Sequence, residues 1–208
     1  MSEPGPSSST SVQIQADDQG MQLCIEVQAL ACHLGSRAAL LDVDVFVAPG
    51  QVHGLLGPRW AGKTTLLRVL AGELAPSAGS ALMPAHVAFV SEAGRSQIEA
   101  RLDRGTAQRV ALARAVAGAP DVLLVDEPAD GFDAATQAAT RSLVGRYTAQ
   151  GGAVVWAARR LDALSGIASG VTLLAGGRVR YSGTVEALVS RALAGHSVHP
   201  AGALRHAA

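Results

Sequence analysis

The feature that most constrains this chain of 208 residues is a glycine-rich segment, Gly57-Pro58-Arg59-Trp60-Ala61-Gly62-Lys63-Thr64. It matches the pattern G-x-x-x-x-G-K-[ST], and it stands between an apolar run, Val52–Leu56, and a run with helical spacing, Thr64–Glu73. A strand, a glycine-rich turn and a helix in this order are typical of a phosphate-binding loop. The alternative is a strand–helix turn of similar composition that holds no ligand.

Each part of this loop has a chemical use. Its glycines let successive backbone N–H groups turn toward phosphate oxygens, and the dipole of the following helix adds positive potential. Lys63, the only lysine in the chain, would bring its ammonium to the β- and γ-phosphates, and the Thr64 hydroxyl would bind Mg²⁺. The predicted nucleotide-binding residues are Gly57, Pro58, Arg59, Trp60, Ala61, Gly62, Lys63, Thr64 and Thr65.

A second motif supplies the acidic groups that a nucleotide site needs. The short apolar run Val122–Val125 ends in Asp126, Glu127 and a proline. Asp126 would hold Mg²⁺, directly or through water. Glu127 would lie beside the γ-phosphate, where a carboxylate can orient or deprotonate a water molecule. We therefore predict Glu127 and Lys63 as catalytic residues and Thr64 and Asp126 as metal ligands, although two carboxylates can also end a strand without any catalytic use.

Composition narrows the class of protein. With 17 basic and 17 acidic residues the formal net charge is zero, so nothing predicts binding to nucleic acid or to an anionic membrane. No apolar stretch approaches the roughly 18 residues of a membrane-spanning helix, and the N-terminus does not read as a secretory signal. Two cysteines, Cys24 and Cys32, suit small core residues in a reducing compartment. The expected location is cytoplasmic.

The order of segments predicts an α/β fold. Residues 1–20 and 193–208 are rich in small and polar residues and are expected to be a disordered segment and a flexible tail around a domain at 21–192. Two alternating segments near the N-terminus, Met21–Ala29 and Leu41–Val47, predict an antiparallel β region. Buried strands interleaved with helices predict a mostly parallel sheet. The expected elements after the loop are strands at 86–91, 122–126 and 153–158, helices at 108–118 and 133–149, and a hairpin at 171–181.

With both motifs in hand, the chain resembles the ATP-binding subunit of an ABC transporter, a P-loop NTPase. The resemblance rests on three segments, VHGLLGPRWAGKTTLLRVLAGEL, QRVALARAVAGAPDVLLVDEPADGFD and GGRVRYSGTVEAL, and spans residues 21–187. It implies ATP and Mg²⁺ as ligands, with nucleotide held between two ATP-binding subunits in a homo- or heterodimer. It also implies a separate membrane-spanning subunit, and so a place at the inner face of the cell membrane.

Several positions depart from the family pattern. Where the family has its signature LSGGQ, this chain has Leu102-Asp103-Arg104-Gly105-Thr106. Asp103 would place a carboxylate near anionic oxygens, which is repulsive unless Arg104 neutralises it. The family's loop glutamine falls on Glu92. Only nine residues separate Glu92 from Leu102, too few for a helical subdomain, because one average helix takes about 11.

Three further departures concern the nucleotide. The family's switch histidine falls on Arg159, which is either a solvated residue at a helix start, the interpretation we favour, or a cation that reaches the γ-phosphate. The aromatic residue that stacks on adenine in the family falls near His33 and Leu34, so we expect weak stacking there. Arg59 and Trp60 replace the family's usual Asn and Gly, and the indole is expected to crowd the nucleotide or a partner subunit.

These observations give two main hypotheses for function. The first is an ATP-binding subunit that binds Mg·ATP and hydrolyses it slowly. The second is a regulatory partner that binds nucleotide without hydrolysing it and takes no part in transport. A GTPase of the usual kind is excluded, because its N-K-x-D motif needs an asparagine, and the chain has none. A small-molecule kinase stays open but would not account for the segments that carry the resemblance.

Overall fold

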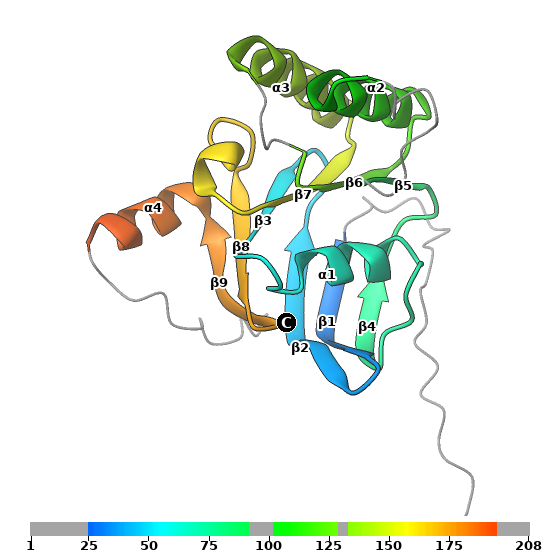
Figure 1. Ribbon diagram of the computed structural model, residues 1–208, viewed down its shortest axis with the longest axis vertical. Helices are drawn as coiled ribbons and strands as arrows, with labels where there is room; N and C mark the ends of the chain where they lie inside the picture. Colours follow the sequence, from blue (N-terminus) through cyan, green and yellow to red (C-terminus); the bar gives the residue numbers. More distant parts are fainter. Residues whose placement is uncertain (1–24, 92–101, 129–132, 195–208) are drawn as a thin grey trace, which may run out of the picture.

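The computed structural model describes residues 25–91, 102–128 and 133–194 (Figure 1). The expectations for residues 1–20, for Cys24, for Glu92 and for the tail beyond Ala194 lie outside these ranges. Within them the chain forms two sheets, flanked by four α-helices and one short 3₁₀-helix.

The larger sheet has six strands in the order β5-β6-β7-β3-β8-β9. All neighbouring pairs are parallel except β8 and β9, which form an antiparallel hairpin. The strands are β3 (Val52–Leu56), β5 (Val87–Val90), β6 (Val122–Asp126), β7 (Ala153–Ala158), β8 (Gly170–Ala175) and β9 (Arg178–Thr184). The central strands β3, β6 and β7 lie side by side, so the segments that end β3 and β6 meet at one edge of the sheet.

The smaller sheet is antiparallel, with the order β2-β1-β4. Its strands are β1 (Ile25–Leu34), β2 (Arg37–Val47) and β4 (Ala78–Leu82). A two-residue turn joins β1 to β2, and Gly35 in that turn has φ +62°, which suits glycine. This sheet lies against the same side of the larger sheet as α1 (Lys63–Leu70) (Figure 1).

Helices cover both faces of the larger sheet. Helix α1 contacts β6 and β7 on one face, while α2 (Arg104–Ala117) and α3 (Ala134–Ala149) pack together over β5 and β7 on the other (Figure 1). The 3₁₀-helix η2 (Leu161–Leu164) and α4 (Val185–Leu193) follow β7 and β9. Side chains cap α2 and α3: Asp103 accepts from the N–H of Thr106 at 3.0 Å, and Asp133 from that of Thr136 at 2.7 Å.

The core consists of two apolar layers, one on each face of the larger sheet. Alternate residues of β6 belong to opposite layers. Val122 and Leu124 belong to the layer shared with α1 and the smaller sheet, and Leu123 and Val125 belong to the layer under α2 and α3. Cys32 is buried in the first layer, as expected of a small core residue. Strands buried on both faces explain why the sequence shows continuous apolar runs there.

The α/β fold with its mostly parallel sheet, flanking helices and N-terminal antiparallel region is confirmed. Three elements were not predicted, β4, η2 and α4. The first expected strand, Met21–Ala29, was ended too early, because β1 continues to Leu34. Within the described ranges, no helix combines the length and the apolar character that a membrane crossing requires.

Candidate functional site

The glycine-rich loop joins β3 to α1 and is anchored on both sides by backbone hydrogen bonds. The N–H of Gly57 donates to the carbonyl of Ala158 at the end of β7, at 3.2 Å, and the N–H of Gly177 donates to the carbonyl of Ala61, at 3.0 Å. Gly62 has φ +106°, and a Cβ there would lie 2.8 Å from the carbonyl oxygen of Ala39. The second glycine of the motif is therefore required by a close approach of β2 as well as by its backbone conformation.

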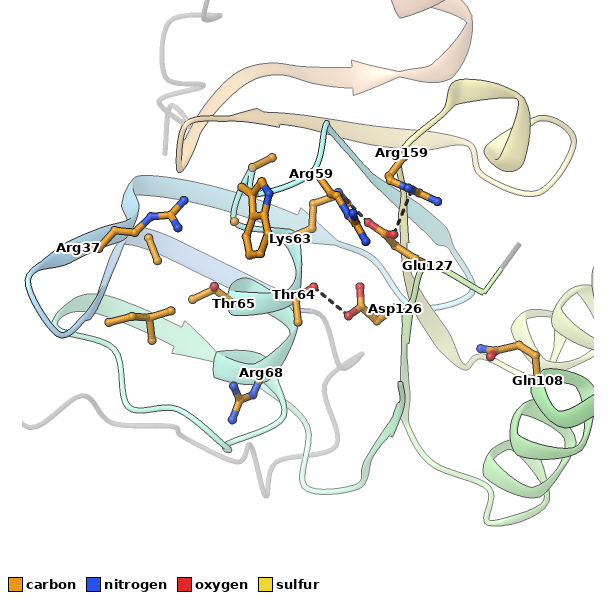
Figure 2. Close-up of a pocket in the computed structure, with 15 residues that line it drawn as sticks. Arg37, Arg59, Lys63, Thr64, Thr65, Arg68, Gln108, Asp126, Glu127 and Arg159 are labelled. Atoms are coloured by element: carbon orange, nitrogen blue, oxygen red, sulfur yellow. Dashed lines mark hydrogen bonds and ion pairs between the residues drawn. The ribbon is translucent and has the colours of Figure 1, made fainter. Parts of the chain in front are cut away.

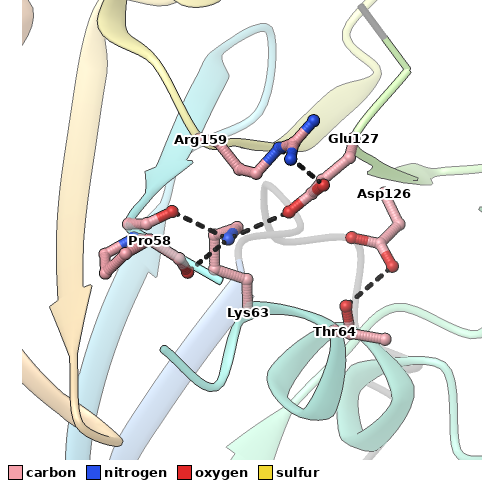
Figure 3. Close-up of polar contacts among 7 residues, drawn as sticks. Pro58, Lys63, Thr64, Asp126, Glu127 and Arg159 are labelled. Carbon is pink, nitrogen blue, oxygen red and sulfur yellow. Dashed lines mark hydrogen bonds and ion pairs between the residues drawn. The ribbon is translucent and has the colours of Figure 1, made fainter. Parts of the chain in front are cut away.

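Lys63 is the first residue of α1 and is only 4% exposed. Its Nζ donates to the carbonyls of Gly57, at 2.8 Å, and Pro58, at 3.0 Å, and forms an ion pair with Oε1 of Glu127 at 3.0 Å (Figure 3). A buried ammonium needs such partners, because an unpaired charge is costly to remove from water. The loop and the acidic motif are thereby joined through one side chain.

A second contact joins the same two motifs. Thr64 Oγ1 donates to Oδ2 of Asp126 at 2.9 Å (Figure 3). The other carboxylate oxygen, Oδ1, is buried and has no hydrogen-bond partner among the residues that the structure describes. Burial raises the pKa of Asp126 and the neighbouring Glu127 adds to this, while the hydrogen bond from Thr64 and the charge of Lys63 act in the opposite direction.

Glu127 is held between two cations. Besides Lys63 on Oε1, Arg159 places its Nε 3.2 Å from Oε2 (Figure 3). The strand register brings them together, because β6 and β7 are neighbours with Asp126 opposite Ala157, and the N–H of Glu127 donates to the carbonyl of Ala157. Arg159 lies just before η2 with 37% of its side chain exposed, as the solvated interpretation expected, and its guanidinium also pairs with the predicted catalytic carboxylate.

The backbone at this position is unusual as well. Glu127 has φ +44°, and Trp60 in the loop has φ +65°. Residues other than glycine seldom adopt such values, which cost on the order of 1–3 kcal/mol each, and they gather at functional sites. Trp60 also leaves 77% of its surface exposed.

These residues line one cavity of about 580 Å³ (Figure 2). Its wall comes from the smaller sheet, the glycine-rich loop, α1, α2 and the ends of β6 and β7. The lining residues are Leu34, Arg37, Ala39, Arg59, Trp60, Ala61, Gly62, Lys63, Thr64, Thr65, Arg68, Gln108, Asp126, Glu127 and Arg159. Because five of them are basic and two are acidic, the cavity suits a polyanion.

The cavity contains most of the predicted site residues. Gly57 and Pro58 contribute their carbonyls to Lys63 instead of lining it. Arg37, Arg68 and Gln108 were not predicted; Arg37 lies in a strand far from both motifs in sequence, and no motif marks it. Asp103 was expected near the anionic oxygens of a nucleotide, and the contact that the structure shows for it is a helix cap, like that of Asp133.

The donor set of the site fits a magnesium ion that phosphate oxygens also hold. Asp126 Oδ1 is a buried acceptor without a partner in the described part of the chain, and the Thr64 hydroxyl is hydrogen-bonded to the same carboxylate. Mg²⁺ prefers oxygen ligands and is commonly bound by one or two protein groups together with substrate phosphates. Among the described residues, no group of three or more His, Cys, Asp or Glu side chains arranged to hold a metal occurs.

Fold and site together define a P-loop nucleotide-binding domain. Comparison with known proteins gives the family: the model described as ABC transporter matches residues 40–94. A zinc import ATP-binding protein ZnuC of Halorhodospira halophila is 30% identical over 205 residues, covering 79% of this chain and 79% of the relative. An aliphatic sulfonates import ATP-binding protein SsuB of Granulibacter bethesdensis is 31% identical over 190 residues, covering 73% and 80%. The chain belongs to the family of ABC transporter ATP-binding subunits.

One further alignment is shorter. The match to ZnuC of Alcanivorax borkumensis, 32% identical, covers 58% of this chain and spans 62% of that relative's length. Among solved structures, a nucleotide-free ATP-binding cassette from an ABC transporter superposes with a TM-score of 0.73 at 16% identity, covering 84% of this chain and 96% of that one. This likeness supports the fold independently of the sequence matches.

Proposed function

We propose that the chain binds Mg·ATP in this cavity and hydrolyses it slowly. The observation that carries the proposal is the 2.9 Å hydrogen bond between Thr64 and Asp126, with Lys63 and Glu127 paired beside it. Two motifs 62 residues apart in sequence thus form one polar site at the N-terminus of a buried helix, which is where a triphosphate and its metal would bind.

Binding of the triphosphate would use groups that are already in place. The backbone N–H groups at the start of α1 have no intrahelical partners and can donate to phosphate oxygens. Lys63 would exchange its contacts to the Gly57 and Pro58 carbonyls for contacts to the β- and γ-phosphates. Its ammonium is already buried, so this exchange adds no desolvation cost for the lysine. The magnesium ion, bound by Thr64 and Asp126, would neutralise developing charge on the phosphates.

Hydrolysis would depend on Glu127 acting on a water molecule next to the γ-phosphate. Both of its oxygens are engaged by cations in the structure. When Lys63 turns to the phosphates one oxygen is released, but Arg159 still holds the other. A carboxylate with one oxygen committed to a guanidinium has fewer geometries in which it can accept a proton from water, so we expect slow turnover.

The partners follow from membership of the family. We propose that the chain pairs with a second ATP-binding subunit, identical or different, and with a membrane-spanning subunit on the cytoplasmic side of the membrane. The relatives' names refer to zinc, to aliphatic sulfonates and to Fe(3+) ions. Because these cargoes have no chemistry in common, they do not define a substrate for this chain.

Equilibrium binding of a fluorescent ATP analogue tests the first part of the proposal. Lys63→Ala should weaken binding by at least tenfold, and Lys63→Arg should restore little of it, because the planar guanidinium cannot enter the space of a compact ammonium. Arg146→Ala, on the far face of the sheet, is the matched control and should bind like the wild type. Equal affinity of Lys63→Ala and wild type would refute the proposal.

A phosphate-release assay tests the second part. We expect a slow, Mg²⁺-dependent rate that Glu127→Gln abolishes while ATP binding is kept. The alternative is a regulatory partner that binds ATP without hydrolysing it and takes no part in transport. If the wild type binds ATP tightly but releases no more phosphate than Glu127→Gln, the result would support that alternative.

A further inference from the structure

The turn between β8 and β9 contacts the phosphate-binding loop through its backbone. Gly176 and Gly177 form this turn, which lies beside the segment that leads into α1 (Figure 1). The N–H of Gly177 donates to the carbonyl of Ala61 at 3.0 Å, and the carbonyl of Gly177 accepts from the N–H of Leu41 in β2 at 2.8 Å. One residue of the larger sheet's hairpin is thus hydrogen-bonded both to the loop and to the smaller sheet.

The position of Gly177 leaves no room for a side chain. Its φ is +74°, and a Cβ there would lie 2.6 Å from the carbonyl oxygen of Ala39 and 3.1 Å from the carbonyl carbon. The adjacent Gly176 has a similar φ of +58°, but a Cβ there would meet nothing within 4 Å. Both glycines suit a left-handed backbone, and of the two only Gly177 is packed against the backbone of β2. A side chain at position 177 would therefore displace the turn.

The same hairpin approaches the first glycine of the loop. A Cβ on Gly57 would overlap the carbonyl oxygen of Leu174, the next-to-last residue of β8. The hairpin therefore lies against the loop at Gly57 and is hydrogen-bonded to it at Ala61. These two contacts set where the backbone of the loop runs between them.

The contact at Ala61 also sets the orientation of a peptide group. The peptide bond between Ala61 and Gly62 is trans, like every other in the described chain. In a planar trans peptide the C=O and the N–H point in opposite directions. Because the carbonyl of Ala61 is held toward Gly177, the N–H of Gly62 is directed away from the turn. Gly62 is the N-cap of α1, where N–H groups have no acceptor within the helix, and both residues line the cavity.

We propose that Gly177 is a positioning residue of the nucleotide site, because its hydrogen bond to the Ala61 carbonyl directs the N–H of Gly62 at a phosphate oxygen. This inference rests on the proposed function and adds a residue outside both the phosphate-binding loop and the acidic motif. Gly177 itself does not touch the ligand; it acts through the peptide group that it orients. An N–H turned away from the phosphate would lose a hydrogen bond to a charged acceptor, which is stronger than one between neutral groups.

The test measures the affinity of the folded protein for ATP and for inorganic tripolyphosphate, each with Mg²⁺, by titration calorimetry. Gly177→Ala should weaken the binding of both ligands by about tenfold or more, the loss of one hydrogen bond to a charged group, and Gly176→Ala by no more than about twofold. Gly176→Ala is the matched control, because it places the same methyl group on a similar left-handed backbone without a clash. Both variants should melt at a lower temperature than the wild type, so the affinities are compared where thermal unfolding shows each protein fully folded.

A measurement on the wild type covers the case in which Gly177→Ala does not fold. In the NMR spectrum of the labelled protein, the amide proton of Gly177 should be protected from exchange with and without ligand. The amide proton of Gly62 should shift and become protected only when tripolyphosphate is added. A Gly62 signal that saturating tripolyphosphate leaves unchanged would overturn the inference.

The outcomes of the titrations separate this inference from the function on which it rests. Wild-type affinity in folded Gly177→Ala, or an equal loss in both glycine variants, would overturn the positioning role while Lys63→Ala still weakens both ligands. If Lys63→Ala binds both ligands like the wild type, the proposed function is overturned, and the inference with it.

Discussion

Asp126 shows, at the scale of a single residue, that a group needed for ligand binding can lower the stability of the ligand-free fold. Its carboxylate is needed as a cation ligand in the proposed function, yet it is largely buried and Oδ1 has no partner in the described structure. Burial makes the charged form unfavourable, so its pKa in the folded chain is raised above the ordinary value of 3.8. The metal would provide the compensation that the protein itself does not.

We predict that Asp126→Asn stabilises the ligand-free protein at neutral pH and removes the Mg²⁺ dependence of ATP binding. Below pH 3.8 the wild-type carboxyl is protonated in both the folded and the unfolded state, and its contribution to stability is fully present. This contribution is lost as the pH rises through the raised pKa of the folded state. Denaturant unfolding should therefore show a variant more stable than wild type at pH 7 and equal to it at pH 3.

Asp162→Asn provides the control of opposite sign. Its carboxylate accepts hydrogen bonds from Arg160 that lower its pKa, so the charged form is the favoured one in the folded chain. This substitution should lower stability at neutral pH. A destabilised Asp126→Asn variant at pH 7 would contradict the account of that residue.

Arg159 gives a second prediction at this scale. If its ion pair with Glu127 limits hydrolysis, Arg159→Ala should raise the turnover number a few-fold and leave ATP affinity within about twofold, because the guanidinium holds the carboxylate and not the nucleotide. The neighbouring Arg160→Ala removes an exposed pair with Asp162 and should not change the rate. A fall in turnover for Arg159→Ala would instead place the guanidinium on the γ-phosphate.

At the scale of elements, the contact between β3 and η2 decides how the central strand is packed. A Cβ added to Gly54 would lie 2.5 Å from one methyl carbon of Leu164 and 3.1 Å from the other. Leu164 is fully buried, so it has little room to move. Position 54, in the strand that leads into the phosphate-binding loop, therefore requires glycine because Leu164 packs directly over it.

We predict that Gly54→Ala lowers the free energy of unfolding by about 1–3 kcal/mol through overpacking, and that Leu164→Ala lowers it by about 2–5 kcal/mol through a cavity. The double variant should lose less than the sum of the two, because the added methyl occupies part of that cavity. Gly145→Ala, in α3 where a Cβ meets nothing within 4 Å, should gain about 0.5–1 kcal/mol. Strictly additive losses in denaturant unfolding would show that the two residues do not compete for space.

The same elements show what a sequence can and cannot predict. The strands β3, β6 and β7 and the helix after the loop are recognisable because long apolar runs and a specific motif mark them. Strand β4, with the sequence AGSAL, lacks the alternation and the branched residues of a typical strand, and exists because β1 offers it a pairing edge. The pairing of Arg159 with Glu127 depends on the register of β6 against β7, and the approach of Arg37 to the loop depends on how the two sheets pack. Neither is encoded in local sequence.

At the scale of the whole molecule, the site joins parts that are distant in sequence. The phosphate-binding loop is hydrogen-bonded to β7 and to the β8–β9 turn. Its lysine is paired with Glu127, the residue after β6, and its second glycine, Gly62, lies close to the backbone of β2. Because a ligand in the cavity would contact all of these parts only in the folded state, binding should stabilise the fold as a unit.

We predict that ATP at 100 times its dissociation constant, with Mg²⁺ present, stabilises the protein by about 2.7 kcal/mol. For a chain of this size that corresponds to a rise of roughly 5–10 °C in the thermal midpoint. Lys63→Ala should show no such rise at the same ATP concentration. A midpoint that ATP shifts equally in both proteins would mean that the ligand binds elsewhere or acts through bulk ionic strength.

The most direct measurement of the central claim is a crystal structure of the protein with Mg²⁺ and a non-hydrolysable ATP analogue. The account predicts the β- and γ-phosphates against the backbone of residues 57–64 and Nζ of Lys63, with the metal between Thr64 and Asp126. Phosphates bound anywhere other than this loop, at saturating ligand, would contradict it.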